Sequence, residues 1–283
     1  MRWRNRRASQ NVEDRRTRSQ RKPLAKGGIV GVLILLAAWY FGIDPNLINQ
    51  VAGPLLDVPS GNTHSDLSPD SDPLAQFTSV VLADTETFWQ RAFAEQQQEY
   101  QEPTLVLYRG ATQTHCGTGQ AAMGPFYCPA DQTIYIDLSF YEDLRQQLGA
   151  PGDFAQAYVI AHEVGHHIQT LTGISQAMHQ RQQRMSEAAA NQESVKLELQ
   201  ADCLAGVWAS YIDQQQWLES GDIEEAMQAA EAIGDDRLQM QSQGRIVPDS
   251  FTHGTSAQRL RWFQLGFTTH DPSACDTFNA SEL

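Results

Sequence analysis

Two histidines and a glutamate lie close together in the segment Ala161–Thr170, which reads AHEVGHHIQT. His162 and His166 are four residues apart, so on a helix their side chains point to nearly the same face. Two imidazoles in this arrangement can hold one zinc ion, and Glu163 lies beside the first histidine in the position of a general base. The pattern therefore predicts a hydrolytic zinc site, provided that the chain supplies a carrier helix and a third ligand.

The residues after the second histidine exclude one class of zinc site. An extended pattern with a third histidine on the same segment would need glycine at position 169 and histidine at position 172. The chain has Gln169 and Thr172 at these positions. The third ligand must therefore come from elsewhere in the sequence.

A pair of acidic residues in a later apolar segment can supply the missing ligand. Glu198 and Asp202 are four residues apart and share one face of a predicted helix. Carboxylates that face a core are costly unless they meet a cation, although an exposed helical face or a salt bridge is the simpler interpretation without the upstream motif. We predict His162, His166 and Glu198 as ligands of one Zn²⁺ ion with a fourth position for water. Asp202 is expected to accept the other ring N–H of a ligand histidine.

Periodic apolar residues predict the elements that must position these side chains. Those between Asp153 and Gly173 recur at helical spacing and predict the carrier helix. Strands are expected at 104–108, 126–127 and 133–137, with the last two forming a hairpin around a turn at 129–132. A few strands followed by several helices indicate an α+β fold. The other predicted helices are 77–100, 140–148, a polar surface helix at 174–191, 195–217, 222–233 and 255–267, the last capped by Thr255 or Ser256.

The charge of the chain is unevenly distributed. Ten Arg and Lys residues against two acidic residues give residues 1–26 a charge of +8. Since the whole chain carries −14, the remainder carries −22. An acidic body would repel phosphate, which argues against a nucleic-acid-binding domain.

An uncharged apolar stretch follows the basic tail. Residues 27–43 read GGIVGVLILLAAWYFGI, a length near the lower limit for a helix that crosses a bilayer. The positive charges before it predict a basic cytoplasmic tail (1–26), a transmembrane anchor (27–43) that contacts the lipid bilayer, and a body on the periplasmic or extracellular side. A cleaved signal peptide is the alternative, although the basic region is long and no clean A-x-A site precedes Asp44. A buried core helix is a third interpretation.

The region after this stretch is rich in Pro, Ser, Asp and Gly and predicts a flexible linker over residues 44–76. The catalytic domain is then expected at 77–283. Four cysteines in such an exported domain allow three disulfide pairings. Cys116 and Cys128 flank a short Gly-rich segment and are expected to pair with each other. Cys203 would then pair with Cys275. Free buried thiols are the alternative.

Four segments together resemble a known family. They read CGTGQAAMGPFYCPADQTIYIDL, AHEVGHHIQTLTG, LELQADCLAGVWA and HGTSAQRLRWFQLGF, and they are similar to the bacterial family called putative neutral zinc metallopeptidases. The likeness covers about residues 108–278, and the basic tail with its apolar stretch also resembles the family. It implies a zincin-like metallopeptidase domain with a small antiparallel sheet packed on several helices, preceded by one N-terminal transmembrane helix.

The resemblance also implies an activity, the hydrolysis of peptide bonds in a protein or peptide substrate by a membrane-anchored endopeptidase. Glu163 would take a proton from zinc-bound water and pass it to the leaving amine. His253 is the candidate for stabilising the oxyanion, with Arg259 or Tyr135 behind it, although a helix-capping or exposed histidine is an equal interpretation. A catalytically inactive zinc-containing envelope scaffold or binding module is the alternative function, and a purely structural site is a third.

Three further assignments concern the surroundings of the motif. By the same resemblance, the strand at 133–137 is expected to hold the substrate backbone as an edge strand. His167 points in another direction from His166 and is interpreted as a residue behind the site or at the surface. His115, beside Cys116, could line the cleft, although a histidine without a role in the site is the preferred interpretation.

Overall fold

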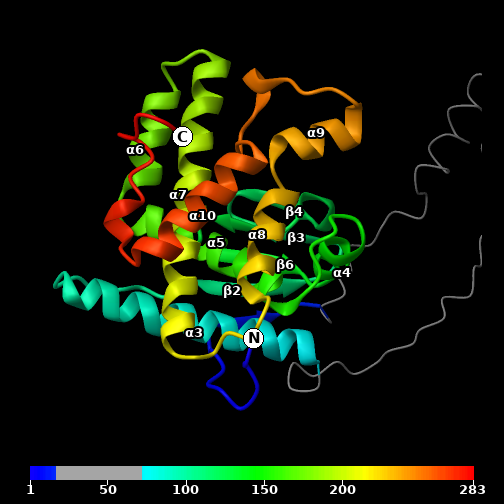
Figure 1. Ribbon diagram of the computed structural model, residues 1–283, viewed down its shortest axis with the longest axis vertical. Helices are drawn as coiled ribbons and strands as arrows, with labels where there is room; N and C mark the ends of the chain where they lie inside the picture. The colour runs from blue at the N-terminus through cyan, green and yellow to red at the C-terminus, as the bar shows by residue number, and fades with distance from the viewer. Residues whose placement is uncertain (17–71) are drawn as a thin grey trace, which may run out of the picture. The chain divides into compact units, whose positions relative to one another are not determined.

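The helix that carries the histidine motif, α5 (Asp153–Leu171), lies at the centre of the structure. This structure is a computed structural model, and it describes residues 1–16 and 72–283. A four-stranded sheet and α3 (Pro73–Glu95) lie on one side of α5 (Figure 1). On the other side α7 (Glu187–Gln214) and α8 (Asp222–Ala232) pack against α5, and α10 (Ser256–Thr269) covers both of them. Shorter helices are α4 (Ser139–Gln146), α6 (Ile174–Gln182) and α9 (Asp235–Gln243).

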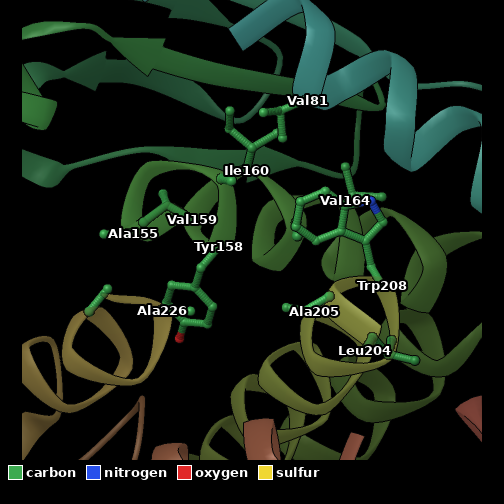
Figure 2. Packing of buried hydrophobic residues seen from close by; sticks show 14 of the residues in the cluster. Val81, Ala155, Tyr158, Val159, Ile160, Val164, Leu204, Ala205, Trp208 and Ala226 are labelled. Atoms are coloured by element: carbon green, nitrogen blue, oxygen red, sulfur yellow. The ribbon is translucent and has the colours of Figure 1, made fainter. Parts of the chain in front are cut away.

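Apolar and small residues occupy nearly all sides of α5, as expected of a helix in the middle of a core. Figure 2 shows Ile160 directed to Val81 of α3 and Tyr158 directed to Ala226 of α8. Trp208 of α7 is fully buried in the same cluster. The polar residues of α5 are therefore surrounded by packed side chains, which restricts their positions.

The sheet is mixed rather than antiparallel. Its strand order is β1-β2-β6-β5, in which β1 pairs with β2 and β2 with β6 in parallel, while β5 and β6 are antiparallel. The β2–β6 register places Leu105 beside Ile134 and Leu107 beside Ile136, and these four side chains join the main core. The strands are β1 (Val12–Asp14), β2 (Thr104–Tyr108), β5 (Phe126–Cys128) and β6 (Thr133–Asp137).

The connection between β2 and β6 explains the parallel pairing. Parallel neighbours need a crossover of a dozen or more residues, and here β3 (Ala111–Thr114), β4 (Gly117–Gln120) and β5 lie between the two strands. β3 and β4 form a separate antiparallel hairpin. β5 then returns antiparallel to β6 and forms the outer edge of the sheet.

Residues 1–16 are part of this folded unit, not a separate tail. Val12 pairs with Leu105 in the parallel ladder between β1 and β2. The ring of Trp3 packs edge-on against Phe77 of α3, with the ring centroids 5.6 Å apart. The arm formed by residues 1–16 therefore adds a strand to the edge of the sheet opposite β5.

Basic residues of this arm neutralise buried carboxylates of α3. Arg6 pairs with Asp84, and Arg7 lies 3.0 Å from Glu86. Ser9 and Asn11 donate hydrogen bonds to the same Glu86 carboxylate, which is fully buried. These contacts hold the arm against α3 within the folded unit.

The predicted fold class needs two corrections. The mixed sheet replaces the expected antiparallel one, because β6 is buried along its whole length between two neighbours. The second correction concerns the expected transmembrane helix, because within residues 1–16 and 72–283 no helix has the length and the apolar character that a membrane span requires. The predicted anchor at 27–43 and most of the predicted linker at 44–76 lie outside the described residues.

The predicted helices are present with shifted ends. α3 begins at Pro73 rather than at Phe77, and α7 begins at Glu187, two turns before the predicted start. α10 begins with a capping box in which the Thr255 hydroxyl and the Gln258 side chain bond reciprocally to backbone N–H groups. α9, a short polar helix, is an addition to the predicted elements.

Candidate metal centre

The close approach of α5 and α7 brings the predicted ligands together. A Cβ atom added to Gly165 would lie 3.0 Å from the Cα and 3.1 Å from the Cβ of Ala201, so only a residue without a side chain fits there comfortably. Gly165 lies just before His166 in the motif, and Ala201 lies between Glu198 and Asp202. The glycine inside the histidine motif therefore sets the helix separation at the site.

His162, His166 and Glu198 offer ligand atoms that all lie within 4.8 Å of one another. The Nε2 atom of His162 is 3.1 Å from one carboxylate oxygen of Glu198, and the Nε2 atom of His166 is 3.4 Å from the other. Ligands about 2.0–2.1 Å from a tetrahedral zinc ion are separated by roughly 3.3 Å. The spacing and chemistry of the two imidazoles and the carboxylate therefore suit a shared zinc ion.

The protonation of these groups is coupled to metal binding. Burial alone would lower the pKa of His162. The carboxylates of Asp202 and Glu198 have the larger effect and raise this pKa above its ordinary value, to about 10. Burial likewise opposes the charged form of His166, and Glu198 outweighs this and raises its pKa. Both shifts favour the protonated imidazoles, with which a metal ion competes, so metal affinity should increase with pH.

Asp202 holds His162 from behind. Its Oδ1 atom accepts a hydrogen bond from Nδ1 of His162 over 2.8 Å, and this bond leaves Nε2 directed to Glu198. Tyr158 donates its hydroxyl to the same oxygen. Asp202 thus lies behind His162, one of the predicted ligands.

Arg259 of α10 completes this arrangement from the core. Its guanidinium binds both oxygens of Asp202, with Nε at 2.8 Å and Nη2 at 2.9 Å, and its side chain is fully buried. Burial opposes the charge of Asp202, but Arg259 and His162 outweigh it and lower its pKa. Arg259 therefore keeps Asp202 ionised, a role different from the predicted one behind His253.

His166 is held by a residue that sequence reasoning used only to exclude another class of site. Gln169 accepts a hydrogen bond from Nδ1 of His166 over 2.9 Å. Its amide nitrogen donates to the carbonyl of Leu197 over 2.7 Å and thereby also fixes α7. The spacing of three residues from His166, which places both on one helix face, is the signal that could have identified Gln169.

Glu163 has the freedom that a proton acceptor needs. Among the described residues, its carboxylate receives no hydrogen bond, and its side chain lines the same cavity as the ligands. Burial raises the pKa of Glu163, although the neighbouring imidazoles oppose this shift. The carboxylate is therefore poised to exchange a proton rather than to hold a fixed partner.

His253 lies at the mouth of this cavity, and its side chain is half-exposed. Its Nδ1 atom is 3.3 Å from Asp235 at the start of α9. The other oxygen of Asp235 accepts three backbone N–H groups, those of Thr252, His253 and Gly254. Asp235, which the sequence did not reveal, therefore fixes both the loop and the ring of His253.

The charge around His253 favours its protonated form. Burial lowers the pKa of this imidazole, but the hydrogen bond to Asp235 and the charge of Glu198 raise it above the ordinary value. With Nδ1 directed to Asp235, a proton on Nε2 is available as a donor. The structure thus brings His253 to the predicted side of the site.

The cavity has a volume of about 510 Å³ and is lined by the ligands, Glu163 and His253 together with apolar side chains. β5 and the turn before it form one wall, and Phe140 and Leu148 contribute to another. β6 is central in the sheet, so β5 is the strand with an open edge beside the site. The strand at 133–137 is therefore not the predicted edge strand, and the edge strand beside the cavity is β5.

Three predicted side chains lie elsewhere. Tyr135 donates its hydroxyl to Asp131 on the far face of the sheet, outside the cavity. His115 is largely exposed and lies near the same aspartate. His167, in contrast, is completely buried between α5 and the sheet.

Both expected disulfides are present. Cys116 is bonded to Cys128 and ties the β3–β4 hairpin to the end of β5. Cys203 of α7 is bonded to Cys275 in the C-terminal segment. Both bonds support elements that surround the cavity.

Two histidines and a glutamate on crossed helices, with a second glutamate free beside them, form the arrangement expected of a zinc peptidase. The chain belongs to the family described as putative neutral zinc metallopeptidase, whose model matches residues 1–278. The family predicted from the sequence is thereby confirmed, and its description names zinc.

Bacterial relatives extend over most of the chain. "Uncharacterized protein YpfJ" of Escherichia coli (strain K12) is 54% identical over 99% of this chain and 100% of its own length. "Uncharacterized protein Rv2575" of Mycobacterium tuberculosis (strain ATCC 25618 / H37Rv) is 44% identical over 65% of each chain. No solved structure matches the chain.

Proposed function

We propose that this protein is an endopeptidase that hydrolyses peptide bonds with one zinc ion held by His162, His166 and Glu198. The observation that carries the proposal is the free Glu163 carboxylate beside a preformed ligand set, in a cavity bordered by an open strand edge. A zinc ion bound there supplies a Lewis acid that polarises the substrate carbonyl and makes water a stronger acid.

The residues of the chain then have distinct tasks. Glu163 accepts the proton of the attacking water and delivers it to the amine of the leaving group. His253, held by Asp235, donates a hydrogen bond to the oxygen on which negative charge develops. Asp202 and Gln169 keep the ligand imidazoles in the required tautomers.

The substrate is expected to be an extended peptide. β5 has one edge paired with β6, and its other edge makes no backbone hydrogen bond to the described residues. An extended peptide can satisfy such an edge by adding a strand, which would direct its backbone along the cavity wall. The apolar lining then favours peptides with apolar side chains near the cleaved bond.

The domain is proposed to work in an oxidising compartment outside the cytoplasm. Two disulfides with no free cysteine in the described residues support this location, because such bonds persist in oxidising spaces. A reporter fused after Leu283 should be active outside the cytoplasm, and activity only inside would contradict the proposal.

A cleavage comparison tests the proposed activity. Envelope proteins are incubated with the native protein or with Glu163→Gln, which keeps all ligands, and new peptide termini are identified by mass spectrometry. The native protein should generate cleavage products that the variant does not, while both bind one equivalent of zinc. Equal products from both would refute Glu163 as the base, and zinc binding without any cleavage would favour a scaffold.

A further inference from the structure

His167, the third histidine in the motif segment, makes two hydrogen bonds through its two ring nitrogens. His167 is completely buried, with its Nε2 atom 2.6 Å from the carbonyl oxygen of Gln101 and its Nδ1 atom 3.0 Å from the hydroxyl of Tyr127. A carbonyl oxygen only accepts, so Nε2 carries the proton. Nδ1 then accepts a hydrogen bond from the hydroxyl of Tyr127, so both ring nitrogens have a partner.

Tyr127 is the middle residue of β5, the strand with the open edge. β5 has only three residues, and a ladder to β6 holds one of its edges while the Cys116–Cys128 disulfide holds its end. The hydrogen bond from Tyr127 to His167 ties the middle of this strand to α5, one residue after the ligand His166. The strand and the ligand helix are thus linked directly.

We propose that His167 is a positioning residue that fixes β5 relative to the ligand helix, so that a peptide added to the strand edge meets the site in register. This inference rests on the proposed peptidase function. An extended peptide on β5 is held by backbone hydrogen bonds whose position follows the strand, and small displacements at a reacting centre are costly in rate. His167 acts through Tyr127 and touches neither the substrate nor the metal.

The ring contacts agree with this role. The imidazole lies edge-on to Tyr127 with ring centroids 5.5 Å apart, and edge-on to Tyr100 at 5.8 Å. Tyr100 and Gln101 lie in the segment that leads into β2. His167 therefore links α5 both to the entry of a central strand and to the outer strand beside the cavity.

Tyr127→Phe in the full, zinc-loaded protein tests the proposal, because it removes one hydroxyl and keeps the ring. Hydrogen–deuterium exchange of the backbone amides at 126–128 should become about five-fold faster, the change expected for one hydrogen bond. Amides of α7 should not change. Tyr108→Phe is the matched control, since the buried hydroxyl of Tyr108 in the same sheet makes no hydrogen bond within the described residues.

Kinetics with a pool of quenched fluorescent decapeptides provide the second readout. kcat should fall about five-fold in Tyr127→Phe with KM nearly unchanged and zinc content equal to native. His167→Leu removes both hydrogen bonds of the imidazole, so the double variant should match His167→Leu alone. Additive losses would argue for two independent roles and overturn the proposal.

The two readouts separate this proposal from the function on which it rests. Unchanged exchange at β5 in Tyr127→Phe overturns the positioning role, whatever the peptidase activity. Faster exchange at β5 together with no cleavage by the native protein supports the link between His167 and β5 but refutes the peptidase.

Discussion

Replacement of Arg6 by alanine should destabilise the protein in a way that depends on pH. The guanidinium of Arg6 pairs with Asp84 of α3 and lies 3.3 Å from the centre of the Trp217 ring. The side chains are only 11% and 8% exposed, so the pair is effectively buried. Removal of one partner from a buried pair costs about 3–5 kcal/mol of unfolding free energy when the other partner stays charged.

The carboxyl of Asp84 can avoid part of this cost by keeping its proton. Burial raises the pKa of Asp84 to about 7 and Glu86 adds to this, although Arg6 and Arg7 oppose the shift. Without Arg6 the pKa must rise further. At pH values below the pKa of Asp84 in the native protein, Asp84 is protonated in both folded proteins. The loss of unfolding free energy on Arg6→Ala is then limited to packing and the contact with Trp217, about 1–2 kcal/mol.

The sign of the pH dependence follows from the protons bound. Above pH 7 the folded native protein releases the Asp84 proton, whereas the folded variant keeps it. The variant therefore loses stability relative to native by about 1.4 kcal/mol for each pH unit until its own pKa is reached. Between about pH 7 and pH 8.5, the destabilisation should grow by roughly 2 kcal/mol.

Urea unfolding of the native protein, Arg6→Ala, Asp84→Asn and the double variant measures this effect at about pH 6 and pH 8.5. In the Asp84→Asn background, the cost of Arg6→Ala should be the same at both pH values, because no carboxyl remains to titrate. Equal destabilisation by Arg6→Ala at the two pH values in the native background would refute the reasoning. It would also argue against an arm that is docked in the folded protein.

Three further predictions concern the metal centre. Gly165→Ala should weaken zinc binding about tenfold, measured by chelator competition, because the added Cβ pushes α5 away from Ala201. Asp235→Asn should lower kcat about tenfold and shift the alkaline limb of the pH profile of kcat to lower pH, since the carboxylate raises the pKa of His253. An unshifted limb would show that Asp235 has no role in catalysis. Zinc removal should lower the unfolding free energy by about 4 kcal/mol relative to zinc at a thousandfold excess over Kd, and Glu198→Ala should show little response to the chelator.

The residues of the site could be placed from sequence because their spacing is helical. His162 and His166 repeat after four residues, as do Glu198 and Asp202, and each pair lies on one helix face. That these two helices meet at the site could be inferred from chemistry, since buried carboxylates need a cation. Asp235 had no such signal, because it lies at the start of a short polar helix without apolar periodicity.

The sheet and the arm could not be predicted in the same way, because their contacts join distant parts of the chain. A five-residue strand such as TIYID has too few residues to distinguish a half-buried edge from a central strand, and only the parallel pairing of β6 with β2 decides between them. The basic arm precedes an apolar stretch, a combination typical of a membrane orientation signal. Its partners Asp84 and Glu86 lie more than 70 residues away, which no local pattern reveals.

Glycines between the site residues allow the helices that carry the site to pack closely. A Cβ added to Gly266 of α10 would lie 1.9 Å from the carbonyl oxygen of Cys203, and one added to Gly206 of α7 would lie 2.1 Å from that of Phe263. These contacts hold α7 and α10 at a distance at which Arg259 reaches Asp202. Gly165 performs the same task between α5 and α7. A separation of the helices by a few tenths of an ångström would therefore disturb the metal centre even with every ligand present.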